Sequence, residues 1–74
     1  MKERLLDLLK EIQPYEEIDY DTLLVSEGIL DSLGLAEFIV ALQEEFGVDI
    51  PEDMITEENF QTIETIRVMI EKLR

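Results

Sequence analysis

The fold is decided by one stretch, residues 31–47, which reads DSLGLAEFIVALQEEFG. At about 100° per residue, its large apolar side chains gather into one stripe, and this pattern predicts a helix with a core-facing side. Asp31 is a good N-cap, and Gly47 suits the position just past the last apolar residue. We therefore expect a helix from Ser32 to Phe46 with this core face: Leu35, Phe38, Ile39, Leu42 and Phe46.

A first helix and a long loop precede this stretch. Residues 2–13 carry apolar side chains at helical spacing, namely Leu5, Leu8, Leu9 and Ile12. Pro14 ends this helix or closely follows it. Residues 14–31 have no clean period, so we expect a long structured loop, and such a loop in so small a domain is more often functional than idle. Its apolar side chains should lie on the core: Ile18, Leu23, Leu24, Ile29 and Leu30.

The C-terminal part predicts one short helix and one longer helix. Residues 48–51 read as an extended connection with two apolar anchors, and residues 56–60 read as a single helical turn capped by a threonine. A last helix should follow a cap at Thr62 and run to about Leu73. We therefore expect an all-α fold, a small four-helix bundle of three main helices plus one short helix, in a single domain over residues 1–74.

The charge of the chain is strongly negative and unevenly distributed. The chain has 6 basic and 19 acidic residues, which give a net charge of −13 at pH 7. Residues 11–66 hold sixteen acidic residues and no basic residue. Such a field repels nucleic acid and anionic lipid and attracts basic protein surfaces. We therefore expect basic protein partners and no nucleic acid, although acidity can also simply keep a small protein soluble.

Missing residue types exclude several kinds of chemistry. Without Cys there is no disulfide and no thiolate of the protein's own, and without His the usual zinc ligand and general base are absent. We expect no metal site.

The longest apolar run, residues 38–42, is too short for a membrane span or a signal-peptide core. The expectation is a cytoplasmic monomer that does not insert into membranes.

Asp31-Ser32-Leu33 lies where the long loop ends and the predicted helix begins. A serine at that place is near backbone N–H groups and the positive end of the helix dipole, where a phosphate is readily accepted and held. Its hydroxyl should be exposed to an outside enzyme. The alternative is purely structural, because Ser and Asp are favoured at helix N-termini in any case.

The helix face opposite the core stripe is unusually apolar. Leu33, Ala36 and Val40 fall on that face, alongside Glu37 and Glu44. An apolar strip edged by carboxylates, beginning beside the serine, is what a docking face for basic partners needs. In the alternative interpretation, the long loop or the short third helix covers Leu33 and Val40.

Three linked segments resemble the acyl carrier protein family. Residues 26–34, SEGILDSLG, are similar to its phosphopantetheine attachment motif. The acidic helix end EEFGV at 44–48 is followed by Ile50-Pro51, and the step NFQTI at 59–63 leads into the last helix, as in that family. The match covers essentially the whole chain in order.

The resemblance implies a four-helix bundle of the acyl-carrier type that carries 4′-phosphopantetheine and is not an enzyme. A phosphopantetheinyl transferase would attach this arm to the Ser32 hydroxyl, with Asp31 and Leu33 beside it and Asp31 near the transferase's metal. The thiol of the arm would hold the cargo as a thioester. Glu37, Val40 and Glu44 occupy positions where the family contacts its enzymes. The implied partners are the transferase and the acyl- or aminoacyl-loading and acyl-transfer enzymes, which would have basic docking surfaces.

The residues around the motif point to more than one cargo. Gly34 and the preceding Glu-Gly-Ile-Leu resemble D-alanyl and other aminoacyl carriers. The tryptophan common late in D-alanyl carriers is missing, however, and the segment after Pro51 resembles general acyl carriers. We expect an acyl carrier that shuttles its group between enzymes of lipid (including fatty acid), polyketide or related biosynthesis, with a D-alanyl or aminoacyl carrier as the alternative.

Three other classes of protein compete with a carrier. An enzyme is disfavoured because there is no His, Cys or glycine-rich phosphate loop to act with Ser32. A calcium loop beginning at Asp19 fails because Leu24 stands where Gly is required and Leu30 where a bidentate Glu is required. An acidic interaction module without a cofactor would use the same docking face and would not need Ser32.

Overall fold

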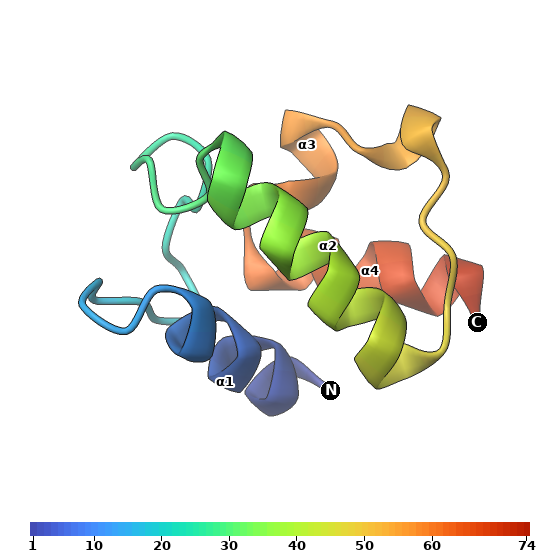
Figure 1. The fold of residues 1–74 in the computed structure, drawn as a ribbon, viewed down its shortest axis with the longest axis horizontal. Helices are drawn as coiled ribbons and strands as arrows, with labels where there is room; N and C mark the ends of the chain where they lie inside the picture. The colour runs from blue at the N-terminus through green and yellow to red at the C-terminus, as the bar shows by residue number, and fades with distance from the viewer.

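The computed structural model describes all 74 residues and contains four α-helices (Figure 1). A long loop separates the first two helices, and a 3₁₀ turn at Glu52–Met54 lies between the second and the third. The helices are α1, Lys2–Ile12; α2, Ser32–Phe46; α3, Glu57–Phe60; and α4, Ile63–Leu73. The predicted all-α bundle of three main helices and one short helix is confirmed.

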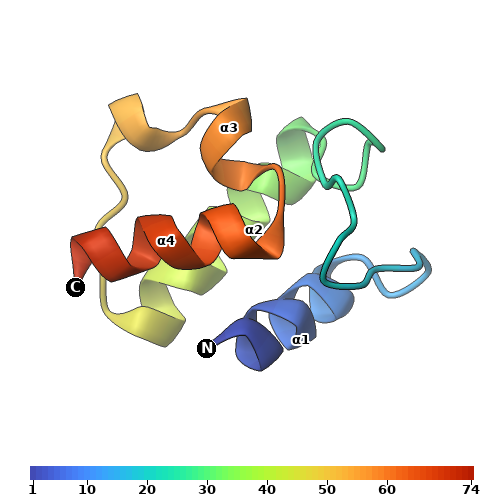
Figure 2. The same ribbon diagram turned by 180° about the vertical axis from the view of Figure 1, so that it is seen from behind.

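The helices are arranged around one interior. α1 packs against α2 and α4, and α3 packs against α4. Seen from behind, α4 lies across the molecule with its C-terminal end at the edge (Figure 2). The longest helix, α2, has 15 residues, and no helix combines the length and the apolar character that crossing a membrane requires.

The ends of α1 and α2 follow from local residue chemistry. The Asp31 carboxylate caps α2 by accepting the Gly34 amide at 2.8 Å, and Gly47 ends the helix in the left-handed conformation with φ +64°. α1 stops at Ile12, one residue earlier than expected, because Gln13 precedes a proline and is therefore held outside helical angles, with φ −125° and ψ 71°.

The C-terminal helices are capped by threonines, as predicted. The Thr56 hydroxyl accepts the Asn59 amide at 3.1 Å, and Thr62 and Thr65 cap α4 reciprocally. The 3₁₀ turn was not predicted from the sequence. It forms because Pro51 fixes its own φ at −64° and accepts the Met54 amide at 2.9 Å, and three residues are too few to give a periodic signal.

The core contains 16 buried apolar side chains drawn from all four helices and from the connections between them. Phe38 of α2 and Phe60 of α3 meet edge to face, with ring centroids 6.4 Å apart. The core face predicted for α2 is centred on Phe38 and Leu42, which are fully buried. Its other three members are only partly buried and pack at the margin of the core: Leu35, Ile39 and Phe46.

The loop between α1 and α2 lies on the core through most of its apolar side chains. The prediction that Leu23 also lies on the core is wrong, since this side chain is 45% exposed. Thr22 and Leu24 on either side are buried, so the backbone at this place directs only the Leu23 side chain outward. The loop also carries both tyrosines of the chain, Tyr15 at 99% and Tyr20 at 43% exposure. The members that are buried as expected are Ile18, Leu24, Ile29 and Leu30.

Candidate functional site: a serine at the start of α2

Ser32 is the first residue of α2 and is exposed. α2 begins where the loop drawn in teal meets the green start of the helix (Figure 1). Asp31 and Leu33, the neighbours of Ser32, are exposed as well. The predicted accessibility of this hydroxyl is therefore confirmed, and an enzyme can approach it from outside the bundle.

The start of α2 offers backbone donors beside this hydroxyl. The Asp31 side chain accepts the Gly34 amide, and the Asp31 carbonyl accepts the Leu35 amide at 2.8 Å. The amides of Ser32 and Leu33 have no acceptor within the chain. Free N–H groups at the positive end of a helix are suited to a phosphate. These donors therefore fit a phosphate ester on the Ser32 hydroxyl.

Gly34 lies buried behind the serine, where the end of α1, the loop and α2 converge. A Cβ added here would lie 2.9 Å from Gln13 Nε2 and 3.2 Å from Asp31 Oδ1. Gln13 Nε2 donates to the Ile29 carbonyl at 2.9 Å. The side-chain amide of Gln13 can lie here because Gly34 has no side chain. The sequence singled out Gly34 only through its resemblance to aminoacyl carriers. Gln13 was missed because one glutamine at a helix end matches no motif.

Gln61 holds the same loop from the junction of α3 and α4, and it was also missed. Its Oε1 accepts the amides of Val25 and Ser26, each at 3.0 Å, and its Nε2 donates to Ser26 Oγ at 2.9 Å. Its carbonyl accepts the Leu24 amide at 2.7 Å. The side-chain partners are 35 and 36 residues apart, so no local pattern in the sequence could reveal this contact.

The outer face of α2 presents the residues predicted for docking. Leu33 is 70% exposed and Val40 52% exposed. Ala36, Glu37 and Glu44 are exposed on the same helix. The alternative in which the long loop or the short helix covers Leu33 and Val40 is wrong.

Ion pairs neutralise acidic residues elsewhere on the surface, at α1, α4 and the end of α2. The closest of them are Lys2–Glu64 at 2.7 Å, Arg67–Glu64 at 2.7 Å and Arg4–Glu45 at 3.0 Å. Hydrogen bonds from Arg67 and then from Lys2 lower the pKa of Glu64 to about 2. Glu37 and Glu44 take part in no ion pair, so their charges stay available to a partner.

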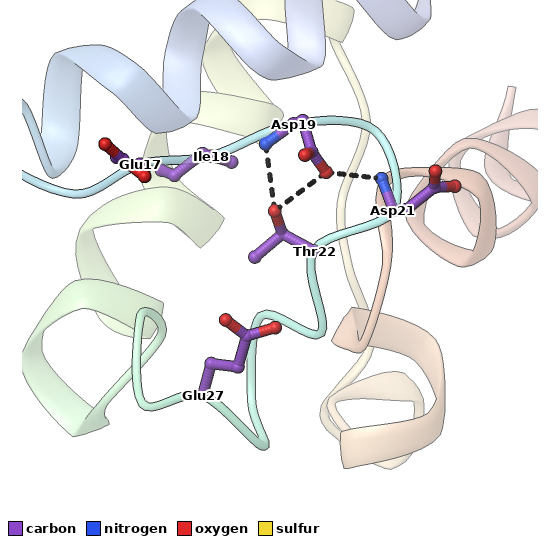
Figure 3. A pocket seen from close by; sticks show the side chains of 6 residues that line it. All are labelled: Glu17, Ile18, Asp19, Asp21, Thr22 and Glu27. Atoms are coloured by element: carbon purple, nitrogen blue, oxygen red, sulfur yellow. Dashed lines mark hydrogen bonds between the residues drawn. The ribbon is translucent and has the colours of Figure 1, made fainter.

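An acidic pocket of about 410 Å³ lies on the long loop (Figure 3). The Asp19 carboxylate accepts the Asp21 amide at 2.9 Å and the Thr22 hydroxyl at 3.1 Å, and the Glu27 carboxylate accepts the Leu23 amide at 3.2 Å. These carboxylates therefore stabilise the turns of the loop itself. No group of three or more acidic side chains is arranged to hold a metal ion.

Comparison with known proteins shows the family to which the chain is similar. A family model for a phosphopantetheine attachment site matches residues 3–71. The chain is 35% identical over 74 residues to the D-alanyl carrier protein of Abiotrophia defectiva, which covers 97% of this chain and 94% of that protein. It is 31% identical over 74 residues to the D-alanyl carrier protein of Lactococcus lactis subsp. cremoris strain MG1363, with 97% and 94% covered. The D-alanyl carrier protein of Listeria welshimeri is 28% identical over 75 residues, with 99% and 96% covered.

The match to the family model and the match to the relative from Abiotrophia defectiva each span nearly the whole helical bundle. The family holds 4′-phosphopantetheine covalently, so the reactive sulfur comes with the cofactor, in keeping with a chain that has no Cys. The chain is a carrier rather than an enzyme, and it belongs to the family of phosphopantetheine-binding carrier proteins.

Proposed function

We propose that this protein carries D-alanine as a thioester on 4′-phosphopantetheine attached to Ser32. The observation that carries the proposal is the exposed Ser32 hydroxyl at the capped start of α2, in a chain whose relatives are named D-alanyl carriers. These relatives favour the aminoacyl alternative over the general acyl carrier of lipid or fatty acid biosynthesis.

Three residues at the start of α2 have separate roles in this proposal. Ser32 supplies the oxygen that bonds to the phosphorus of the phosphopantetheine phosphate of coenzyme A. The pyrophosphate bond of coenzyme A breaks, adenosine 3′,5′-bisphosphate leaves, and the hydroxyl proton passes to a base of the transferase. The unpaired amides of Ser32 and Leu33 are the backbone donors available to that phosphate. One oxygen of Asp31 caps the helix, and we assign the other to the metal and basic residues of the transferase. Once attached, the arm supplies the thiol that holds the cargo.

The filled interior supports a small cargo. Phe38, Leu42, Phe60 and Ile66 have no exposed surface, and the two phenylalanine rings are in contact. Protein interiors packed in this way transmit strain, so a long acyl chain would have to displace core side chains. An alanyl group has a single methyl and needs no apolar pocket.

The outer face of α2 is the proposed docking surface for the transferase and for the enzyme that loads D-alanine. Leu33 and Val40 would supply the apolar centre, flanked by the small side chain of Ala36. Glu37 and Glu44 would supply unpaired negative charge around it. An enzyme surface that fits therefore has basic residues around an apolar patch.

Intact-protein mass before and after incubation with coenzyme A, magnesium and a broad-specificity phosphopantetheinyl transferase tests the attachment. We expect a gain of one phosphopantetheine, mapped to Ser32. Ser32→Ala should gain nothing and keep its helical circular dichroism, because Asp31 still caps α2. Ser26→Ala, which removes the other serine of the chain, is the matched control and should still accept the arm. Full loading of Ser32→Ala, or no loading of the wild type, contradicts the proposal.

The cargo is tested on the loaded protein with ATP, D-alanine and a D-alanine-activating ligase. We expect a further mass gain of one alanyl group that hydroxylamine removes, as it does from a thioester. L-Alanine and the protein without its arm are the controls. If acyl-transfer enzymes load the protein and the D-alanine ligase does not, the general acyl reading replaces this one.

A further inference from the structure

The segment before Ser32, residues 24–30, is folded back by its own hydrogen bonds and is held by Gln61 at its start. The Leu30 amide donates to the Leu24 carbonyl at 2.9 Å, and the Gly28 amide donates to the Val25 carbonyl at 3.0 Å. The Leu24 amide in turn donates to the carbonyl of Gln61. The position of Leu30, just ahead of the attachment serine, therefore depends on where Gln61 holds Leu24.

The side chain of Gln61 adds three hydrogen bonds to this backbone contact, and together they fix the start of the segment. Its Oε1 is the acceptor for two successive amides, those of Val25 and Ser26, and its Nε2 donates to the Ser26 hydroxyl. A single side chain thus fixes the direction of the backbone at this turn as well as its distance from the bundle. The bond of Gln13 to the Ile29 carbonyl holds the other end of the segment.

We infer that Gln61 is a positioning residue for cofactor attachment, because it holds residues 24–30 so that Ser32 meets the transferase in one orientation. The inference rests on the proposed attachment at Ser32. Gln61 follows α3 and is no part of the outer face of α2, so it acts through the loop and does not touch the reacting hydroxyl. Losing the tie lets the segment open locally while the helices stay packed.

Gln43 offers a matched control within the same chain. It is also half-buried, and its Oε1 accepts the Ile50 amide at 3.1 Å. It therefore ties a loop to α2 in the same chemical manner, but at the end of the helix remote from Ser32. A general loss of stability would follow from replacing either glutamine, whereas mispositioning of Ser32 would follow only from replacing Gln61.

The test compares transferase kinetics for the wild type, Gln61→Leu, Gln61→Glu and Gln43→Leu, all at a temperature where circular dichroism shows them folded. For Gln61→Leu, kcat/KM for the carrier should fall about tenfold, since the Val25 and Ser26 amides lose their acceptor. KM for coenzyme A should not change, because coenzyme A binds to the transferase. Gln61→Glu should restore kcat/KM to within about twofold, because its carboxylate accepts both amides, and Gln43→Leu should lose less than about twofold.

The pattern of amide hydrogen exchange distinguishes a local opening of the loop from a general loss of stability, which would also speed exchange in the core helices. In Gln61→Leu, the amides of Val25 and Ser26, which lose their acceptor, and the amide of Leu30 should exchange faster, while those within α4 keep their wild-type rates. Equal kinetics and equal exchange for Gln61→Leu and Gln43→Leu would overturn the inference. If Gln61→Leu does not fold, Gln61→Asn replaces it, since the shorter side chain withdraws the acceptor. Failure of the wild type to accept the arm would instead sink the proposed function, and the exchange rates would still decide whether Gln61 holds the loop.

Discussion

Replacing Gly34 by alanine should destabilise the protein, although alanine is favoured over glycine in helices by about 1 kcal/mol. Gly34 has no positive φ, so backbone strain does not enter. The difficulty is space, because the added Cβ would lie 2.9 Å from Gln13 Nε2 and 3.2 Å from Asp31 Oδ1. The flexible end of Gln13 must swing away, and its hydrogen bond to the Ile29 carbonyl is lost.

The size of the effect follows from the groups that are disturbed. Breaking the Gln13–Ile29 hydrogen bond costs about 1 kcal/mol if water replaces it, and up to about 3 kcal/mol if the carbonyl stays buried. Crowding of Asp31 weakens a helix cap whose full loss costs about 1 kcal/mol. After subtraction of the gain in helix propensity, we expect a net loss of about 1–2 kcal/mol in the free energy of unfolding.

Urea denaturation followed by far-ultraviolet circular dichroism measures this loss of stability. A double-mutant cycle with Gln13→Ala shows how much of the loss comes from the contact with Gln13. In the Gln13→Ala background the clash with Nε2 is absent, so Gly34→Ala should cost about 1 kcal/mol less than in the wild type. The contact with Asp31 remains, so some cost should persist. An increase in the urea midpoint for Gly34→Ala alone, or equal effects in both backgrounds, would refute this reasoning.

The remaining predictions concern the charges of the protein. Glu37→Lys or Glu44→Lys should lower kcat/KM with a partner enzyme by about tenfold at low salt. The urea midpoint should stay nearly unchanged, because both side chains are exposed and form no ion pair. Unchanged kinetics would count against the docking surface. Glu64 has its pKa lowered from 4.5 to about 2 by Arg67 and Lys2, so its stabilising effect is complete above pH 4.5 and is lost as the pH falls toward 2. The urea midpoint of Glu64→Gln should therefore fall less steeply between pH 4.5 and pH 2 than that of the wild type. An equally steep fall would contradict the stabilising role of Glu64. The melting temperature should rise with moderate salt or millimolar magnesium, since residues 11–66 carry only negative charge, and indifference to both would show that self-repulsion is minor.

The helices could be predicted from the sequence because their signals are periodic or local. The α2 stripe places Phe38 and Leu42 in the core, and the same wheel places Leu33 and Val40 in solvent, as the structure confirms. The cap at Asp31 is recognisable from neighbouring residues alone. These features depend on contacts between residues a few positions apart, where sequence spacing translates directly into geometry.

The long loop was only partly predictable, because its geometry is set by contacts distant in the chain. The error at Leu23 arose because an apolar residue outside a periodic segment gives no indication of which way its side chain points. The ties made by Gln13 and Gln61 join side-chain amides to backbone groups far away in the sequence, and such bonds impose no composition or spacing on the residues between them. The surroundings of Ser32 therefore depend on the least predictable part of the fold.

Both tyrosines lie on the long loop, at positions 15 and 20, and the chain has no tryptophan. Fluorescence excited near 280 nm consequently reports on the loop alone, while far-ultraviolet circular dichroism reports on the four helices. The native protein thus contains two independent optical probes without any label. Coincident melting curves from the two would mean that loop and bundle unfold as one unit, whereas an earlier fluorescence transition would measure the free energy of releasing the loop from an intact bundle.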